Sequence, residues 1–140
     1  MDYPEGFEPH FRKSNFTAPW EPLYSKIEDS QIRLGVELRE AHCNSRSLVH
    51  GAFLTALADN AIGLSLGLEL EKQDRVASGL VTVNLSIDYV GMATVGQWIS
   101  TDTEVIKIGG SMGFAASIIS NSDGPIARVN ATFKILNPKG

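Results

Sequence analysis

The sequence predicts an α+β domain in which an antiparallel sheet of five to six strands wraps around one long central helix. Residues 52–70 are the single stretch in which apolar and small residues recur at helical spacing throughout. Two alternating segments precede this stretch, and from Ala77 onward the apolar period is two. Because one helix cannot cover both faces of so large a sheet, we expect the sheet to curl around the helix and bury it nearly all round.

Length and composition narrow the class of protein. A chain of 140 residues can bury a core in one domain without disulfides or a metal. The net charge of −4 argues against a nucleic-acid binder, which needs a basic face. The N-terminus has no signal peptide, no apolar run spans a membrane without small or polar breaks, and the lone Cys43 cannot form an internal disulfide. These features predict a cytoplasmic protein.

We expect residues 1–20 to form an N-terminal arm and residues 21–140 to form the domain. Phe7 and Phe11 lie one helical turn apart, so a short helix or turn would lay both rings on the domain. The arm then either covers apolar surface or roofs a binding pocket. His10, in the same segment, is expected at the surface.

The remaining elements follow from alternation and turn residues. Strands are predicted at residues 23–27 and 32–38, with a turn at Asp29-Ser30 and a loop over 40–49 before the helix. After a charged connector, further strands are predicted at 77–89, 98–107, 111–120 and 127–135, with turns at 108–110 and 121–124. In the strand at 77–89, strict alternation puts two sets of side chains on opposite faces of the sheet. One set is Val81, Val83, Leu85, Ile87 and Tyr89, and the other is Thr82, Asn84, Ser86 and Asp88.

One carboxylate, Asp59, interrupts the apolar helix. Small residues flank it one turn either way, among them Thr55, Ala56 and Gly63. A buried charge costs several kcal/mol unless it is paired or used. Asp59 therefore pairs with a buried arginine, caps a neighbouring loop, or takes part in chemistry.

Four residues carry a resemblance to a known family. Asn44, His50 and Gly51 form the pattern N-x5-H-G at the start of the helix, Asp59 follows nine residues after the histidine, and the strand segment GLVTVNLSIDYV comes next. With this element order, residues 20–136 resemble the hotdog-fold acyl-CoA thioesterases of the PaaI-like (phenylacetate-pathway) and 4-hydroxybenzoyl-CoA thioesterase type. The usual second glycine of that pattern is Ala52 here, which narrows the room for a ligand beside the backbone.

The resemblance implies hydrolysis of a small or medium acyl-CoA, aryl-CoA included, to the free acid and coenzyme A, with no cofactor. The backbone N–H of Gly51 would polarise the carbonyl, helped by the helix dipole. Asp59, two turns along, would act as general base on water or as nucleophile, and Asn44 would hold the water or the thioester. The resemblance also implies a homodimer or homotetramer whose active site lies at the subunit interface, with Thr82 coming from the neighbouring subunit.

Each site residue also has a structural alternative. His50 in such a loop more often bonds the backbone, Asn44 suits an irregular loop that needs bracing, and Thr82 is an ordinary β-former. Further substrate contacts are expected from Ala52, Phe53, Thr55, Ala56, Val81, Val83, Gly110 and Ser111. Candidates for the phosphates of coenzyme A are Arg46, Lys107, Arg128 and Lys134, which are equally ordinary surface charges.

Other chemistries find less support. His42 and Cys43 have no third partner at metal-ligand spacing, so no zinc site is expected, and no base stands beside Cys43 to activate it. A hydratase or dehydratase on the same fold would use His50 and Asp59, but the proline-rich loop of the dehydratases is missing between residues 42 and 53. A non-catalytic acyl-CoA-binding protein would lack the helix carboxylate or carry a DNA-binding segment. The acyl group, and coenzyme A against acyl carrier protein as its carrier, stay open.

Overall fold

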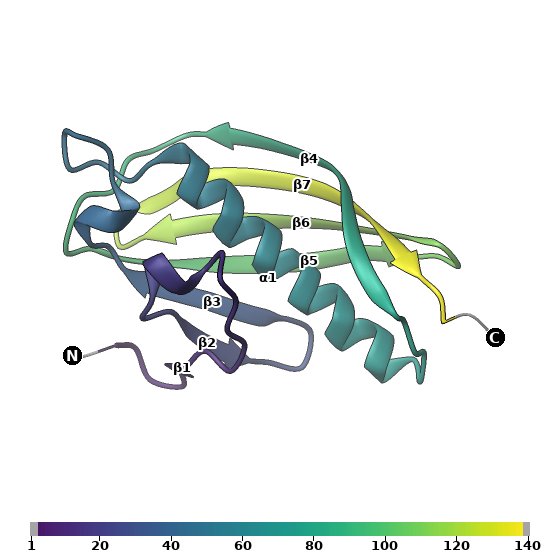
Figure 1. Cartoon of the computed structure of the whole chain (residues 1–140). Helices are drawn as coiled ribbons and strands as arrows, with labels where there is room; N and C mark the ends of the chain where they lie inside the picture. Colours follow the sequence, from purple (N-terminus) through teal and green to yellow (C-terminus); the bar gives the residue numbers. More distant parts are fainter. Residues whose placement is uncertain (1–2, 139–140) are drawn as a thin grey trace.

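One antiparallel sheet curls around one helix (Figure 1). The computed structural model describes residues 3–138. The helix α1 spans Gly51–Lys72, and the sheet has the strand order β1-β2-β3-β5-β6-β7-β4. The strands are β1 (Glu8–Pro9), β2 (Tyr24–Ile27), β3 (Ile32–Glu37), β4 (Gly79–Tyr89), β5 (Trp98–Ile108), β6 (Met112–Asn121) and β7 (Gly124–Leu136), and two 3-10 turns, η1 (Ala18–Trp20) and η2 (Glu40–His42), lie between them.

The predicted fold class is confirmed, with seven strands where five to six were expected. The additional strand is β1, two residues of the arm that pair with β2 through Glu8 opposite Ser25 and Pro9 opposite Tyr24. The predicted short helix or turn over Phe7 and Phe11 is therefore wrong. The extended backbone buries Phe7 against Trp98, with ring centroids 5.1 Å apart, and leaves Phe11 54% exposed.

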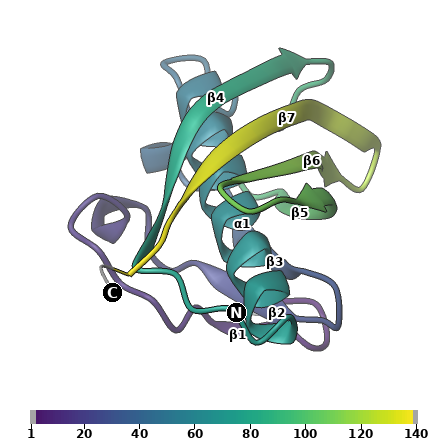
Figure 2. The same ribbon diagram turned by 90° about the vertical axis from the view of Figure 1, so that its right-hand side faces the viewer.

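The apolar composition of α1 reflects its position inside the curled sheet (Figure 2). The helix contacts β3, β4, β5, β6 and β7, and its buried face includes Leu54, Ala58, Ile62 and Leu66. Its length and apolarity would also suit a membrane span, but packing against the sheet accounts for them in this fold. Ser65, the one polar residue of the buried face, donates to the Ala61 carbonyl and accepts from the Ile32 N–H, so its burial leaves no unpaired group.

Strand β4 forms one edge of the sheet, because within residues 3–138 it pairs with β7 alone. Its register shifts between Thr82 and Asn84, where one extra residue forms a bulge. The predicted side-chain directions, which assumed strict alternation along β4, are therefore wrong for the residues before the bulge. Thr82 faces the helix and Val81 and Val83 are about half exposed, whereas Leu85 and Ile87 pack against the core as predicted.

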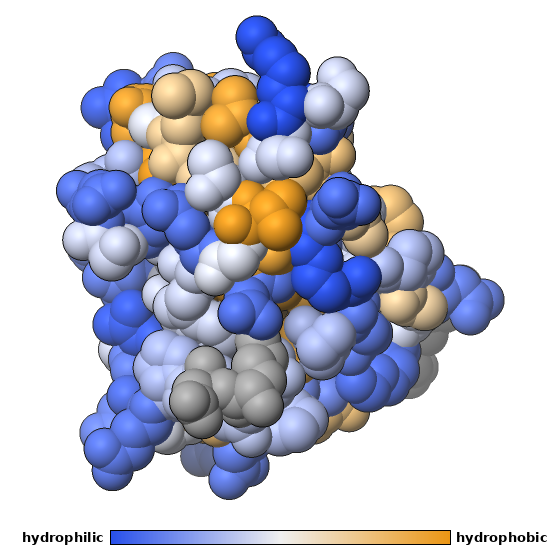
Figure 3. Space-filling view, turned by 90° about the vertical axis from the view of Figure 1, so that its left-hand side faces the viewer, coloured by the Kyte–Doolittle hydropathy of each residue, from blue (hydrophilic) through white to orange (hydrophobic). Residues whose placement is uncertain are grey.

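The end of the molecule at the N-terminus of α1 carries exposed apolar side chains. Seen from that end, orange apolar atoms gather in the upper half of the surface among hydrophilic residues (Figure 3). The end of β4 contributes the exposed Tyr89, and the segment that follows contributes Val90, Met92 and Val95. An edge strand followed by such side chains is a feature of surfaces that associate.

Candidate active site

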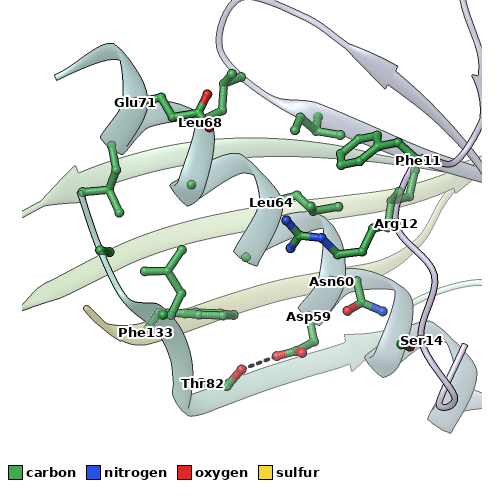
Figure 4. Close-up of a pocket in the computed structure, with 18 of the residues that line it drawn as sticks. Phe11, Arg12, Ser14, Asp59, Asn60, Leu64, Leu68, Glu71, Thr82 and Phe133 are labelled. Carbon is green, nitrogen blue, oxygen red and sulfur yellow. Dashed lines mark hydrogen bonds between the residues drawn. The ribbon is translucent and has the colours of Figure 1, made fainter. Parts of the chain in front are cut away.

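Asp59 and Thr82 meet beside the helix. Oγ1 of Thr82 donates a 2.5 Å hydrogen bond to Oδ1 of Asp59, and Figure 4 shows the two side chains pointing toward each other. Both residues belong to the same chain, because β4 passes directly over α1 and the bulge turns Thr82 inward. The expectation that Thr82 reaches Asp59 from a neighbouring subunit is therefore wrong.

This pairing also decides between the structural alternatives for Asp59. Within residues 3–138 the carboxylate has no arginine partner, and Thr82 is its recorded hydrogen-bond partner. A hydroxyl donor fixes the orientation of the carboxylate that accepts its hydrogen bond. Because Thr82 occupies Oδ1, the second oxygen is left for another molecule. A half-buried, oriented carboxylate of this kind can take a proton or attack an electrophile.

A cavity of about 700 Å³ opens beside Asp59 and Thr82 and runs along α1 (Figure 4). Its helix wall carries Asn60, Leu64 and Leu68, and its sheet wall carries Leu80 of β4 and Phe133 of β7. The arm supplies the remaining wall with His10, Phe11, Arg12, Ser14 and Thr17. Residues 1–20 therefore do both things that the sequence left open: Phe7 covers apolar surface, and the following residues line a pocket.

The N-terminus of α1 offers a backbone donor some distance from Asp59. The Gly51 carbonyl accepts hydrogen bonds from Thr55 Oγ1 and the Tyr89 hydroxyl, while the described part of the chain holds no acceptor for the Gly51 N–H. A Cβ on Gly51 would lie 2.8 Å from Cζ of Tyr89, so the glycine is needed for the tyrosine ring to lie against the backbone.

Gly51 and Asp59 of one chain cannot act on the same carbonyl group. Eight residues separate them, which is about 12 Å along a helix axis. An oxyanion donor and an attacking group must each lie about 3 Å from the reacting atoms. The expected division of labour along a single helix is therefore wrong for one chain by itself.

His50 and Asn44 hold the backbone that leads into the helix. Nδ1 of His50 accepts a 3.0 Å hydrogen bond from the Ala52 N–H, which makes His50 the N-cap of α1. Oδ1 of Asn44 accepts from the backbone N–H groups of Arg46 and Leu48. Both residues thus have the bracing roles weighed above, and their chemical roles stay predictions.

The remaining predicted contacts lie away from the cavity. Phe53 is 3% exposed and packs against the His42 and Trp20 rings, so it belongs to the core. The carbonyls of Gly109 and Gly110 accept hydrogen bonds from Arg75, which places the β5–β6 turn at the C-terminal end of α1. Asp59 and Thr82 are the predicted site residues that line the cavity; those that do not are Asn44, His50, Gly51, Ala52, Phe53, Thr55, Ala56, Val81, Val83, Gly110 and Ser111.

Sequence reasoning missed most of the cavity wall. Gly63 and Gly67 follow Asp59 at steps of four residues and line the cavity on the same side of the helix. That spacing was the available signal. The contribution of the arm had no comparable signal, because it depends on the pairing of β1 with β2.

Two histidines are buried rather than exposed. His10, expected at the surface, is 8% exposed and lines the cavity, and its Nδ1 has no hydrogen-bond partner. His42 is 1% exposed, accepts from the Arg39 N–H through Nδ1 and lies 2.9 Å from the Trp20 carbonyl through Nε2. Burial lowers the pKa of both imidazoles, so both favour the neutral form.

The other candidate groups have ordinary surroundings. Burial raises the pKa of the Cys43 thiol, which disfavours the thiolate that a nucleophile needs. Within residues 3–138, no three His, Cys, Asp or Glu side chains gather closely enough to hold a metal ion. Arg128 pairs with Asp88 on the surface, 2.8 Å apart, and Arg46, Lys107 and Lys134 are exposed.

Comparison with known proteins identifies the family. The sequence model of the thioesterase superfamily matches residues 47–127. The Pseudomonas aeruginosa protein named "Putative esterase PA0474" is 34% identical over 137 residues, which cover 96% of this chain and 98% of that protein.

Solved structures agree on the fold. A hypothetical thioesterase from Streptococcus pneumoniae, solved with coenzyme A, superposes with a TM-score of 0.73 at 18% identity, over 86% of this chain and 94% of that chain. A variant of the phenylacetic acid degradation protein PaaI from Thermus thermophilus superposes with a TM-score of 0.70 at 18% identity, over 81% of this chain and 93% of that chain. The hotdog fold and the PaaI-like resemblance predicted from the sequence are thereby confirmed.

Proposed function

Because this chain belongs to the thioesterase superfamily and is a thioester hydrolase, we propose that it hydrolyses an acyl-CoA to the free acid and coenzyme A, with Asp59 as the attacking group or general base. The observation that carries the proposal is the Thr82-oriented carboxylate at one end of a cavity whose helix and sheet walls carry apolar side chains. A thioester needs both features, since its carbonyl carbon must meet a base or nucleophile while its acyl part leaves water. The relative solved with coenzyme A supports that carrier for the acyl group.

Hydrolysis through Asp59 as general base follows from this geometry. Oδ2 takes a proton from water while the water oxygen bonds to the carbonyl carbon, and the carbonyl oxygen becomes an oxyanion. When the carbonyl re-forms, the carbon–sulfur bond breaks and the coenzyme A thiolate leaves, taking the proton from Asp59 or from solvent. If Asp59 attacks the carbonyl carbon itself, the carbon–sulfur bond breaks, the coenzyme A thiolate leaves, and the resulting mixed anhydride is then cleaved by water. Single turnover in H₂¹⁸O reveals this route when water attacks the anhydride at the Asp59 carbonyl, because ¹⁸O then enters that side chain.

A second copy of the chain supplies the oxyanion donor in this proposal. Thr82 lies near the start of edge strand β4, and Tyr89 at its end contacts Gly51. If two β4 strands pair antiparallel about a twofold axis between Leu85 and Ser86, Thr82 of one copy faces Tyr89 of the other. That pairing carries Gly51 of one copy toward Asp59 of the other. It also covers the exposed Val81 and Val83, so we infer a homodimer or a larger assembly built from it.

A panel of acyl-CoA and aryl-CoA substrates, assayed by release of free thiol, tests the activity. Wild type should release thiol, and Asp59→Asn should lower kcat by about 10²–10⁴-fold because the amide can neither accept the proton nor attack. Asp123→Asn makes the same change at an exposed residue between β6 and β7, away from the cavity, and is the matched control that should behave as wild type. Full activity in Asp59→Asn, or no hydrolysis of any panel member by wild type, would refute the assignment.

A further inference from the structure

The cavity has the form of a channel that follows the helix away from Asp59. Gly63, Gly67 and Glu71 come at successive steps of four residues after Asp59, and all four residues line the cavity. Steps of four keep side chains on nearly the same face of a helix. The channel therefore begins at the carboxylate and runs toward the C-terminal end of α1, as Figure 4 shows with Asp59 and Glu71 at opposite ends.

The two glycines differ in what they make room for. A Cβ on Gly63 would lie 3.3 Å from Cε2 of Phe133, so packing against that ring accounts for the glycine. A Cβ on Gly67 would lie 3.9 Å from Cδ1 of Leu80, which is ordinary contact distance. Packing does not account for Gly67, although glycine is a poor residue for a helix interior. A longer side chain there would enter the channel.

The middle of the channel is apolar on the helix and sheet walls. Leu64 and Leu68 come from α1, Leu80 from β4 and Phe133 from β7. The arm wall is more polar: beside Phe11 it carries His10, Arg12, Ser14 and Thr17. On the helix and sheet walls the polar groups stand at the ends, with Asp59, Asn60 and Thr82 at one end and Glu71 and Arg75 at the other.

Resting on the proposed acyl-CoA hydrolysis, we propose that this channel binds an unbranched aliphatic acyl chain of medium length, extended along α1 over Gly63 and Gly67. The helix rises about 12 Å from Asp59 to Gly67 and about 18 Å to Glu71. An extended hydrocarbon advances about 1.3 Å per methylene, given carbon–carbon bonds of about 1.5 Å. The span to Gly67 corresponds to about nine carbons and the span to Glu71 to about fourteen. A chain of about nine to twelve carbons therefore ends between Gly67 and the polar end at Glu71, and the substrate class is medium-chain acyl-CoA rather than aryl-CoA.

Chain-length profiles of wall variants test the channel. In wild type, kcat/KM should rise from butyryl-CoA to decanoyl-CoA and exceed the value for benzoyl-CoA. Gly67→Leu should shorten the preferred chain, with the decanoyl-to-butyryl ratio falling about fourfold for each methylene that no longer fits, or about 60-fold for three. Leu80→Phe narrows the same place from the sheet wall and should shift the profile in the same direction. Lys72→Leu adds the same side chain to the same helix outside the channel and should keep the wild-type profile.

Binding without turnover separates this inference from the proposed function. Calorimetry with decanoyl-CoA on Asp59→Asn, alone and combined with Gly67→Leu or Leu80→Phe, should give weaker binding in both double variants. If wild type hydrolyses nothing but these binding differences appear, the hydrolysis proposal fails and the channel stands. If thiol is released but Gly67→Leu and Leu80→Phe both keep the wild-type profile and affinity, the channel is refuted. Should one of the two variants fail to fold, the other decides. Wild-type preference for benzoyl-CoA over decanoyl-CoA also overturns the inference.

Discussion

Removing the Gly51 N–H without disturbing the helix would test whether two chains share each active site. Gly51 is the first residue of α1, a position at which proline is favoured. Proline there removes only a backbone N–H that makes no hydrogen bond within the helix. The preceding residue, His50, has φ −77° and ψ 133°, which a following proline permits. Gly51→Pro should lower kcat by about 10²–10³-fold, as expected for the loss of one oxyanion donor.

Gly51→Ala is the matched control, because it adds the same Cβ beside Tyr89 but keeps the N–H. Both variants crowd the Tyr89 ring, so the difference in kcat between them measures the effect of losing the backbone N–H alone. Equal activity in the two variants would refute the role of the Gly51 N–H.

Mixing inactive chains then shows where the donor comes from. In the proposed dimer, Gly51 and Asp59 of one chain lie about 12 Å apart and belong to different active sites. A dimer of one Gly51→Pro chain and one Asp59→Ala chain would then have one intact site and one site with both defects. Random exchange makes half of all dimers mixed, and about a quarter of wild-type activity should return. Asp59 and Thr82 share one chain and one site, so a mixture of Asp59→Ala and Thr82→Ala should recover nothing. Recovery in the second mixture but not in the first, after exchange is proven by mass spectrometry, would contradict the arrangement.

Three further predictions concern the site, the interface and pH. Thr82→Val removes the hydroxyl that orients Asp59. Because a hydrogen bond to a charged group contributes about 1.5–3 kcal/mol, kcat in the thiol-release assay should fall about 10- to 100-fold. Thr82→Ser keeps the hydroxyl and should keep most of the activity. Val83→Glu, placed opposite Asp88 of a second copy by the proposed β4 pairing, should dissociate the assembly in light scattering and abolish activity, while Val83→Thr should do neither. Burial lowers the pKa of His42 below its usual value of about 6.5, so the unfolded chain binds that proton first as pH falls. The contribution of His42 to the free energy of unfolding should be flat above about pH 7 and decrease below about pH 6.5 by up to about 1.4 kcal/mol per pH unit. His10, whose pKa burial also lowers, adds a contribution of the same sign, so chemical denaturation of His42→Gln should show a shallower acid slope than wild type but keep part of it.

The periodicity of apolar residues was sufficient to predict the fold. It failed in β4, where one extra residue reverses which side chains face the helix. The apolar run of α1 and the alternation of the later strands depend on many side chains together, so they survive local irregularity. The inward position of Thr82 depends on one bulge at Val83, which no pattern in β4 announces. Because the prediction lacked this bulge, it placed Val81 and Val83 on the core side. The expected subunit origin of Thr82 came from the family resemblance instead, and the hydrogen bond between Thr82 and Asp59 within one chain contradicts it.

The candidate site likewise has one part that the sequence predicts and one part that it does not. Asp59 stood out because a carboxylate in an apolar helix conflicts with its surroundings, and such conflicts mark functional positions. The cavity wall has no such conflict: Leu64, Leu68 and Leu80 are residues that any core would use. Their role depends on the arm, which leaves a channel beside α1 instead of packing onto it, and that is a tertiary property of β1 and β2.

In the proposed dimer, the spacing of Gly51 and Asp59 would let one helix serve two active sites. Both residues need α1, the first for its unpaired N-terminal N–H and the second for a position at the mouth of the channel. A helix keeps them about 12 Å apart, too far for one thioester. Thr82, near one end of β4, contacts Asp59, and Tyr89, at the other end, contacts Gly51. If the β4 strands of two copies pair antiparallel, Thr82 of one copy faces Tyr89 of the other. Asp59 of the first copy would then lie near Gly51 of the second. On this reasoning an isolated chain binds an acyl group but hydrolyses it poorly, so activity should fall with the dimer on dilution while decanoyl-CoA binding per chain persists.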